Sequence, residues 1–228
     1  MQTIRLKQEK LPYEINEELK LLRTNLFFCG ADKRVILVTS AFSGEGKSTV
    51  TLDLCRSLAE LGKRVILLDA DMRKSVLKTK VSSQLPENGL SHYLSSQCQL
   101  DDILCQTGTE GFYTVVSGAV PPNPSELLSS DNMKRLVAYC RDHFDYVIID
   151  SPPVGMVVDA AVVAPICDGS LILIEANEVK YRLAQEVAAQ MRATGCPILG
   201  VVLNKVDYKK NGKYYNKYYG KKYQGYYA

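Results

Sequence analysis

The sequence predicts a doubly wound α/β domain with a mostly parallel sheet flanked by helices, and two observations carry this prediction. From Arg34 onward, short runs rich in Val, Ile and Leu alternate with helix-length stretches. These apolar runs are continuous, which is typical of parallel strands that are covered on both faces. Alternating strands and helices favour a doubly wound fold, in which functional sites lie at the carboxyl ends of the strands.

Each element follows from the local pattern. Strands are expected at 35–39, 65–69, 113–116, 146–150, 171–175 and 198–203, and long helices at 47–61, 125–143 and 181–193. Before them, Ile15, Leu19, Leu22 and Leu26 share one stripe of a helix that packs on its own domain or on a neighbouring subunit. Segment 74–111 is polar and weakly periodic, so we expect short helices over the strand ends. Whether these helices form a lid or a substrate-facing surface stays open.

Composition excludes several classes of protein. The chain is 46% hydrophobic and 23% charged, which is typical of a globular domain and not of a disordered or fibrous chain. Seven cysteines without a C-x-x-C pair indicate reduced thiols in a cytosolic protein, and two isolated histidines offer no zinc site. No signal peptide is visible, and the longest apolar run, 160–167, is far shorter than the roughly 18–20 residues of a membrane span.

Charge is distributed unevenly along the chain. Residues 208–228 hold six lysines, eight of the 14 tyrosines and no acidic side chain. The preceding residues carry 22 basic against 25 acidic side chains and are mildly acidic. The sequence therefore predicts a mildly acidic body followed by a basic, tyrosine-rich tail.

A phosphate-binding loop is predicted between the first long strand and its helix. Residues 35–39 run into the sequence Ser40-Ala-Phe-Ser-Gly-Glu-Gly-Lys-Ser-Thr49 and then into a helix, which is the order of a P-loop, although Ala41 stands where the strict pattern has Gly. Glycines let backbone N–H groups converge on phosphate oxygens, and the helix N-terminus adds a favourable dipole. We expect Lys47 to reach the β- and γ-phosphates and Ser48 to bind magnesium. The expected nucleotide-binding residues of the loop are Ser43, Gly44, Glu45, Gly46, Lys47, Ser48 and Thr49.

Three carboxylates are expected to face this loop. Asp69 and Asp71 form a D-x-D at the end of one buried strand, and Asp150 ends another. Strand-end aspartates often only cap the next turn, but three of them in a chain with a P-loop favour chemistry. Such carboxylates hold magnesium, order its waters or accept a proton. With Lys47 they form the candidate catalytic set, in which Asp69 and Asp71 are candidates for the base and for ordering the magnesium waters, and Asp150 for the metal shell.

Several motifs occur together in the order found in one enzyme family. They are Gly44-Glu-Gly-Lys-Ser-Thr49, Leu68-Asp-Ala-Asp-Met-Arg73, Pro121-Pro-Asn-Pro-Ser-Glu-Leu127, Val147-Ile-Ile-Asp-Ser-Pro-Pro153 and the terminal tyrosine cluster. Over residues 14–228 the chain resembles the bacterial tyrosine kinases of capsule and exopolysaccharide assembly, of the Gram-positive split type. The resemblance implies a P-loop NTPase-like fold, an ATP-dependent protein-tyrosine kinase, and ATP and Mg²⁺ as cofactors.

The resemblance also implies autophosphorylation of the tail, in trans, in a ring-shaped homo-oligomer that regulates polysaccharide synthesis and export. The expected acceptors are Tyr214, Tyr215, Tyr218, Tyr219, Tyr223, Tyr226 and Tyr227. Family rings use an E-x-x-R-x-x-R helix, and here Glu17, Lys20 and Arg23 stand at those positions, so that a lysine without the planar fork of arginine replaces the first arginine. A transmembrane adaptor that holds a cytoplasmic kinase at the inner face of the membrane, and a counteracting tyrosine phosphatase, are further implied partners.

Three regions are expected on this basis. Residues 1–33 form an N-terminal arm with the oligomerisation helix, residues 34–207 the P-loop kinase domain, and residues 208–228 a flexible, tyrosine-rich tail, which is expected to be disordered.

Two other classes of P-loop protein fit part of the sequence. Tyrosine interleaved with lysine also suits single-stranded nucleic acid, and a P-loop ATPase with such a tail would be a partitioning or positioning ATPase. ATPases of that class resemble one another in a P-loop with a signature lysine. Phe42 stands at the position of that lysine here, which counts against this class. Asn204-Lys205-Val206-Asp207 matches the guanine-reading N-K-x-D pattern, so GTP stays open, with Asn204 as a purine-edge contact. The kinase is favoured, and no nucleic-acid partner is expected.

Overall fold

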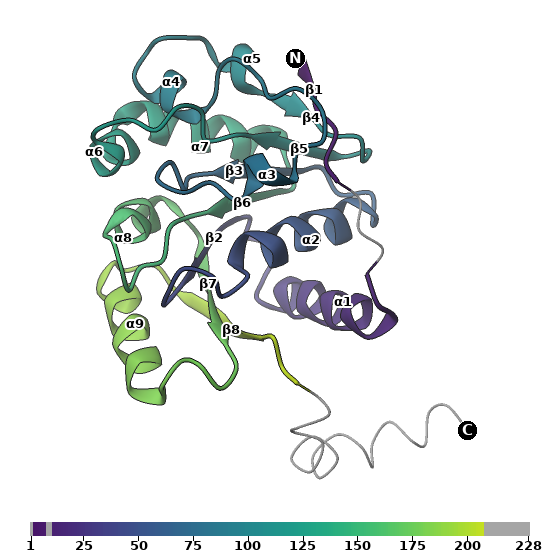
Figure 1. Ribbon diagram of the computed structural model, residues 1–228, viewed down its shortest axis with the longest axis vertical. Helices are drawn as coiled ribbons and strands as arrows, with labels where there is room; N and C mark the ends of the chain where they lie inside the picture. The colour runs from purple at the N-terminus through teal and green to yellow at the C-terminus, as the bar shows by residue number, and fades with distance from the viewer. Residues whose placement is uncertain (1, 8–10, 208–228) are drawn as a thin grey trace.

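A central sheet organises the chain in the computed structural model, which describes residues 2–7 and 11–207 (Figure 1). Over these residues the sheet has eight strands in the order β1-β4-β5-β3-β6-β2-β7-β8. The strands are β1 (Gln2–Thr3), β2 (Val35–Ser40), β3 (Val65–Asp69), β4 (Cys105–Gln106), β5 (Phe112–Val115), β6 (Tyr146–Asp150), β7 (Gly169–Glu175) and β8 (Ile198–Asn204). All neighbours pair in parallel except β4 and β5, which are antiparallel. The predicted mostly parallel α/β fold is confirmed.

Strand register brings the predicted site residues to one edge of the sheet. Asp69 at the end of β3 is the pairing partner of Asp150 at the end of β6. Strand β2, which leads into the predicted phosphate loop, lies between β6 and β7. Because parallel strands end at the same edge, the loop and the two aspartates lie together there.

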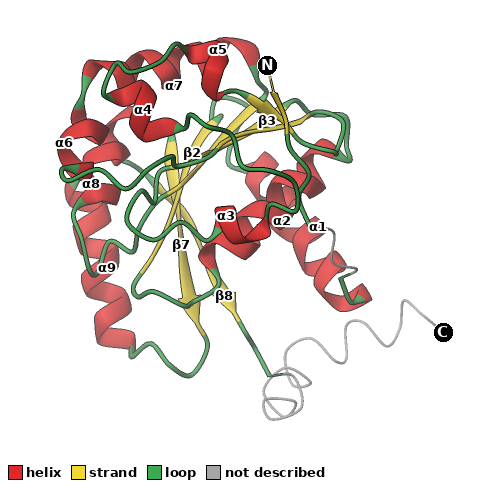
Figure 2. Ribbon diagram, turned by 45° about the horizontal axis from the view of Figure 1, so that its top comes forward, coloured by secondary structure: helices red, strands yellow, loops and turns green. Residues whose placement is uncertain are grey.

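Helices cover both faces of the sheet (Figure 2). One layer contains α1 (Tyr13–Phe28), α2 (Lys47–Ala59) and the short α3 (Leu77–Lys80). The other contains α4 (Leu90–Leu94), α5 (Leu100–Ile103), α6 (Pro124–Ser129), α7 (Asp131–His143), α8 (Asp159–Val163) with the 3₁₀ turn Ala164–Ile166, and α9 (Tyr181–Ala193). Two apolar cores result, one on each face, and the fully buried strands β2, β3 and β6 contribute side chains to both.

The structure departs from the expected elements in three places. The helix expected at 125–143 is two helices, because Ser130 between them has extended backbone and its side chain accepts a hydrogen bond from the Met133 N–H to cap α7. Strands β1 and β4 were not predicted, since two residues carry no readable pattern. Strand β1, which lies in the expected arm, joins the edge of the sheet in parallel with β4. Segment 74–111 forms the expected short helices α3, α4 and α5.

The arm helix α1 packs on α2 of the same chain. Leu19 and Leu26 of its apolar stripe are buried, whereas Ile15 at its start is exposed. The Arg23 guanidinium donates to the backbone oxygen of Ser57 at 2.8 Å and to its hydroxyl at 2.9 Å. No helix within the described ranges is long and apolar enough to cross a membrane.

Candidate active site

A glycine loop joins β2 to α2 at the carboxyl edge of the sheet. Gly44 and Gly46 have φ of +94° and +86°, a backbone region that residues with a Cβ rarely adopt. A Cβ at Gly46 would also lie 2.3 Å from the Asn204 Nδ2 atom. The loop then enters α2, whose first residue is Lys47. Both glycines are therefore required by the path of the loop.

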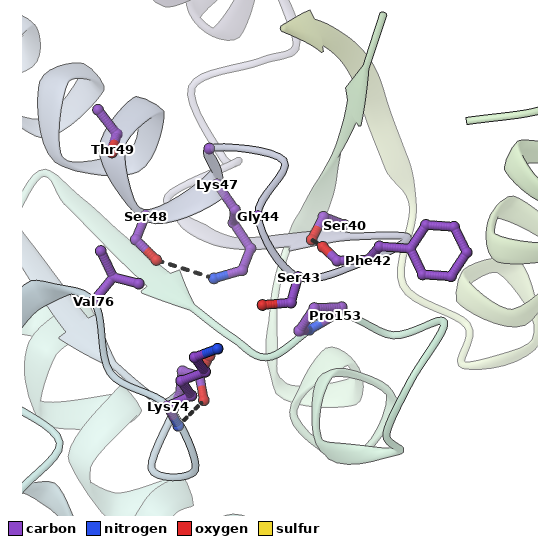
Figure 3. A pocket seen from close by; sticks show the side chains of 12 residues that line it. Ser40, Phe42, Ser43, Gly44, Lys47, Ser48, Thr49, Lys74, Val76 and Pro153 are labelled. Carbon is purple, nitrogen blue, oxygen red and sulfur yellow. Dashed lines mark hydrogen bonds between the residues drawn. The ribbon is translucent and has the colours of Figure 1, made fainter. Parts of the chain in front are cut away.

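A cavity of about 340 Å³ lies in front of this loop (Figure 3). Its lining residues are Ser40, Phe42, Ser43, Gly44, Gly46, Lys47, Ser48, Thr49, Asp71, Lys74, Val76 and Pro153. Of the predicted nucleotide-binding residues, only Glu45 and Asn204 are outside this lining. The loop, the N-terminus of α2 and a lysine thus face one space, which is the arrangement that binds phosphate.

Lys47 and Asp150 form a buried ion pair beside the cavity. The Lys47 ammonium lies 2.5 Å from Asp150 Oδ1, and the two side chains are 7% and 3% exposed. The same ammonium lies 3.3 Å from the Ser48 hydroxyl oxygen. Asp150 therefore balances the charge of Lys47 and fixes its position at the mouth of the loop.

Asp69 is a fully buried carboxyl group next to this pair. Its Oδ2 accepts a hydrogen bond of 2.5 Å from the Ser75 hydroxyl, whereas its Oδ1 has no hydrogen-bond partner within the described part of the chain. Burial, followed by the nearby charge of Asp150, raises the pKa of Asp69 from 3.8 to about 7. A carboxyl with this pKa exchanges its proton near neutral pH, as a general base requires.

The segment after β3 is held by an ion pair with a second part of the chain. Arg73 donates to both carboxylate oxygens of Asp159, at 2.7 and 3.0 Å, and Ser125 donates to one of them at 2.6 Å. Burial disfavours the ionised form of Asp159, but these hydrogen bonds outweigh it and the pKa of Asp159 is lowered. Within the segment, Asp71 accepts a hydrogen bond of 2.9 Å from the backbone N–H of Lys74.

Asp159 was not singled out from the sequence. Two signals could have found it: Arg73, two residues after the D-x-D motif, whose guanidinium is typically paired with a carboxylate, and the hydroxyl of Ser125 in the Pro-rich motif. The Pro-rich motif thus anchors the segment that carries Asp69 and Asp71.

The end of β8 holds the loop from the side away from the cavity lining. The Asn204 amide donates to the backbone oxygen of Glu45 at 2.8 Å. The Lys205 ammonium donates to the backbone oxygen of Gly44 and to the Glu175 carboxylate, both at 2.8 Å. The buried carboxylate of Glu45 in turn accepts from the Ala41 N–H at 3.0 Å, and burial raises its pKa. These residues shape the loop, while contact of Asn204 with a purine base stays a prediction.

We expect Asn204→Ala to weaken the binding of ADP and ATP by similar factors of about 5–10, because one hydrogen bond to the loop, of roughly 1–1.5 kcal/mol, is lost. Calorimetric titration with each nucleotide measures the effect. Asn132→Ala is the matched control, since the Asn132 amide donates to the backbone oxygen of Leu94 at 3.0 Å, between α7 and α4. Unchanged affinities in Asn204→Ala would show that the loop keeps its shape without this bond.

The remaining predicted residues lie away from the cavity or outside the described ranges. Glu17 and Lys20 form an exposed ion pair of 2.6 Å on α1, near the Arg23–Ser57 contact. A second cavity of about 380 Å³ lies between α1 and α2, and Glu17 and Lys20 line it. The seven predicted acceptor tyrosines lie in 208–228, outside the residues that the structure describes.

Comparison with known proteins agrees with this geometry. Residues 33–192 match the family described as AAA domain. The tyrosine-protein kinase CpsD of Streptococcus pneumoniae serotype 4 is 40% identical over 213 residues, which cover 92% of this chain and 94% of the relative. The solved kinase domain of the Escherichia coli tyrosine kinase ETK is 31% identical, with a TM-score of 0.79 over 88% of this chain and 82% of its own.

A further solved structure, the chimerical protein CapA2B2, has a TM-score of 0.81 at 28% identity over 90% of this chain and 94% of its own. The family inferred from the motifs is thus confirmed over nearly the whole chain, and this sets aside the partitioning-ATPase alternative. The enzyme is an ATP-dependent protein-tyrosine kinase, and the chain belongs to the bacterial tyrosine kinases of capsule and exopolysaccharide assembly.

Proposed function

We propose that this kinase transfers the γ-phosphate of ATP chiefly to the tyrosines of its own tail, in trans, and that this modification regulates capsular or exopolysaccharide synthesis and export. The observation that carries the proposal is the position of Asp69. A buried carboxyl with a pKa of about 7 ends β3 as the pairing partner of Asp150, which forms the ion pair with Lys47 beside the phosphate cavity. That combination provides both a base for an acceptor hydroxyl and a cation for a phosphate.

Tyrosine as acceptor requires such a base. A phenol has a pKa of about 10, so it is neutral near pH 7 and must lose its proton during transfer. In the step, the phenol oxygen bonds to the γ-phosphorus while the bond from that phosphorus to the bridging oxygen of ADP breaks. Asp69 takes the phenol proton, and Lys47 stabilises the negative charge on the phosphate oxygens.

The residues present fit a magnesium ion. Within the described residues no group of three or more His, Cys, Asp or Glu side chains could hold a metal by itself. Magnesium in nucleotide sites instead takes one or two protein ligands and completes its shell with phosphates and waters. Ser48 and Asp71 line the cavity and Asp150 lies beside it, so that Ser48, Asp71 and Asp150 would hold the ion, while Asp69, which has an oxygen without a partner in the described part of the chain, would contact it only through one of its waters. When bound, the ion neutralises charge on the phosphates.

The start of the tail is well placed for transfer between subunits. Strand β8 ends at Asn204, at the edge of the sheet that carries the loop, and residues 208–228 follow closely. Twenty extended residues span at most roughly 66–72 Å, which suffices to enter the site of a neighbour. The six lysines of this segment favour its approach to a polyanionic nucleotide.

A ring, a membrane adaptor and a phosphatase complete the proposal. Helix α1, which carries the Glu17–Lys20 pair, exposes apolar side chains at its two ends, Tyr13 and Phe28, which supports docking on a neighbouring subunit. Exposed Phe42, Met156 and Val158 offer an apolar surface for a protein partner. We propose that a transmembrane adaptor recruits the kinase to the inner face of the membrane and activates it, and that a tyrosine phosphatase reverses the modification.

We expect replacement of the seven predicted acceptor tyrosines by Phe to remove nearly all phosphotyrosine, because the acceptors are lost while the site stays intact. The wild type and this variant are incubated with Mg-ATP, and modified tyrosines are mapped by mass spectrometry. A mixture of Lys47→Met, as acceptor, with a chain that lacks 208–228, as donor, tests transfer in trans. Adding the cytoplasmic segment of an adaptor to the same assay tests activation.

Three results would contradict this proposal. Equally heavy tyrosine labelling of the chain that lacks 208–228 would show that the tail is not the main acceptor. Strongly salt-dependent binding of single-stranded DNA by the full chain, but not by the truncated one, would favour a nucleic-acid role for the tail. Competition between ATP and GTP tests the base preference, since clear preference for GTP would contradict an ATP-dependent kinase.

A further inference from the structure

A second lysine faces the phosphate cavity from the wall opposite the glycine loop. Lys74 lines the same cavity as Lys47, and its side chain extends toward the space in front of Lys47 (Figure 3). The backbone of Lys74 is fixed there, because its N–H donates to Asp71 Oδ1 at 2.9 Å. Lys74 therefore comes from the segment that carries the proposed catalytic aspartates, whereas Lys47 is the first residue of α2, directly after the loop.

The charges around the cavity distinguish Lys74 from its neighbours. Lys47 is paired with Asp150 at 2.5 Å, and Arg73 is paired with Asp159 at 2.7 Å. The Lys74 ammonium makes no hydrogen bond or ion pair with any residue in 2–7 or 11–207. Its positive charge is therefore not offset by a carboxylate partner and is directed at whatever occupies the cavity.

The position of Lys74 selects one phosphate of the nucleotide. The loop and the N-terminus of α2 surround the inner end of the cavity, where backbone N–H groups bind the β-phosphate in P-loop proteins. The next phosphate outward must then lie between the loop and the wall that contains Asp71 and Lys74. A cation on that wall is placed to meet the phosphate that is transferred.

We propose that Lys74 is a catalytic residue that binds an oxygen of the γ-phosphate of ATP. The inference rests on the proposed kinase reaction at this site. Lys74 holds the phosphoryl group from the side of the aspartates while its bond to ADP breaks and its bond to the tyrosine oxygen forms, and it takes up no proton. Charge on the three outer oxygens of the transferred group is then shared between Lys47 and Lys74.

The test compares nucleotides that differ by one phosphate. Affinities for ADP and for a non-hydrolysable ATP analogue are measured by calorimetry in the wild type, Lys74→Met and Lys74→Arg. Lys63→Met is the matched control, since Lys63 is an exposed lysine that precedes β3 at the opposite edge of the sheet. We expect Lys74→Met to lower the affinity for the ATP analogue about tenfold or more and the affinity for ADP less than twofold. Lys74→Arg should retain most of the wild-type affinity for the analogue.

Kinetics and the remaining outcomes complete the test. The kcat for tyrosine phosphorylation should fall about 100-fold in Lys74→Met, as for loss of one donor to a transferred phosphate. The proposal would be overturned if Lys74→Met lowered the affinities for both nucleotides equally, or lowered neither. A rise confined to the KM for a tyrosine peptide would also overturn it. A wild type that binds both nucleotides but phosphorylates no tyrosine would contradict the proposed function, while the affinity ratio would still decide the role of Lys74.

Discussion

Lys47→Met is expected to lower tyrosine phosphorylation by a factor of about 1000 or more. The variant loses the cation that we propose to stabilise charge on the β- and γ-phosphates during transfer. Phosphotyrosine in the purified protein, measured by mass spectrometry after incubation with Mg-ATP, checks the expectation. Persistent phosphotyrosine in this variant would exclude the glycine loop as the active centre.

The same variant should also be less stable, because Lys47 is the partner of a buried carboxylate. Asp150 is almost fully buried, and the loss of its ion-pair partner leaves its charge uncompensated. Breaking such a pair from one side costs about 3–5 kcal/mol. We expect the double variant Lys47→Met with Asp150→Asn to recover much of the free energy of unfolding, measured in urea, but none of the activity. That pattern separates the catalytic loss from any loss of folded protein.

Asp69→Asn is expected to lower kcat/KM for tyrosine phosphorylation by a factor of about 100–10,000, since the amide cannot accept the phenol proton. In the wild type, kcat/KM should rise about tenfold per pH unit up to about pH 7 and then level off, because the proposed base Asp69 accepts a proton only when ionised and its pKa is about 7. This acid limb should disappear in Asp69→Asn and persist in Asp71→Asn, the matched control. An unchanged limb in Asp69→Asn would assign the base elsewhere.

The raised pKa of Asp69 also predicts a gain of stability in this variant. Between about pH 4 and pH 7 the unfolded chain has released a proton that the folded protein keeps, so the wild type loses stability as the pH rises through this window. Above pH 7 Asp69 is ionised in the folded protein, and the burial of this charge lowers the free energy of unfolding by its full amount. Asp69→Asn should therefore unfold at higher urea concentration than the wild type at pH 8, and the difference should shrink toward pH 4.

The site could be predicted from the sequence where its signal is local. The loop motif requires particular residues at fixed spacing, and Gly44 and Gly46 occupy left-handed backbone there. Asp69 and Asp150 could be placed together because both end apolar strands of a parallel sheet, and the register pairs them directly.

Other parts of the site depend on contacts between distant residues and carry no local signal. Asp159 is 86 positions from Arg73 and 34 from Ser125, so no spacing reveals that the three meet. The N-K-x-D pattern predicts contact of Asn204 with the purine ring of the nucleotide. Its hydrogen bond to Glu45, across 159 positions, could not be predicted because it depends on β8 lying beside β7. The break at Ser130 was missed because apolar residues continue at helical spacing on both sides, and only the cap geometry marks the boundary.

The contacts of Asn204 and Lys205 have a mechanical consequence. These two residues lie just before residues 208–228, and their side chains hold the backbone of Glu45 and Gly44. Tension applied to the chain beyond Asp207 is therefore shared between the bonds of these residues to Ala176 and Glu175 and the hydrogen bonds that shape the nucleotide loop. A subunit whose C-terminal segment is stretched into a neighbour would thus carry a load on its own ATP site.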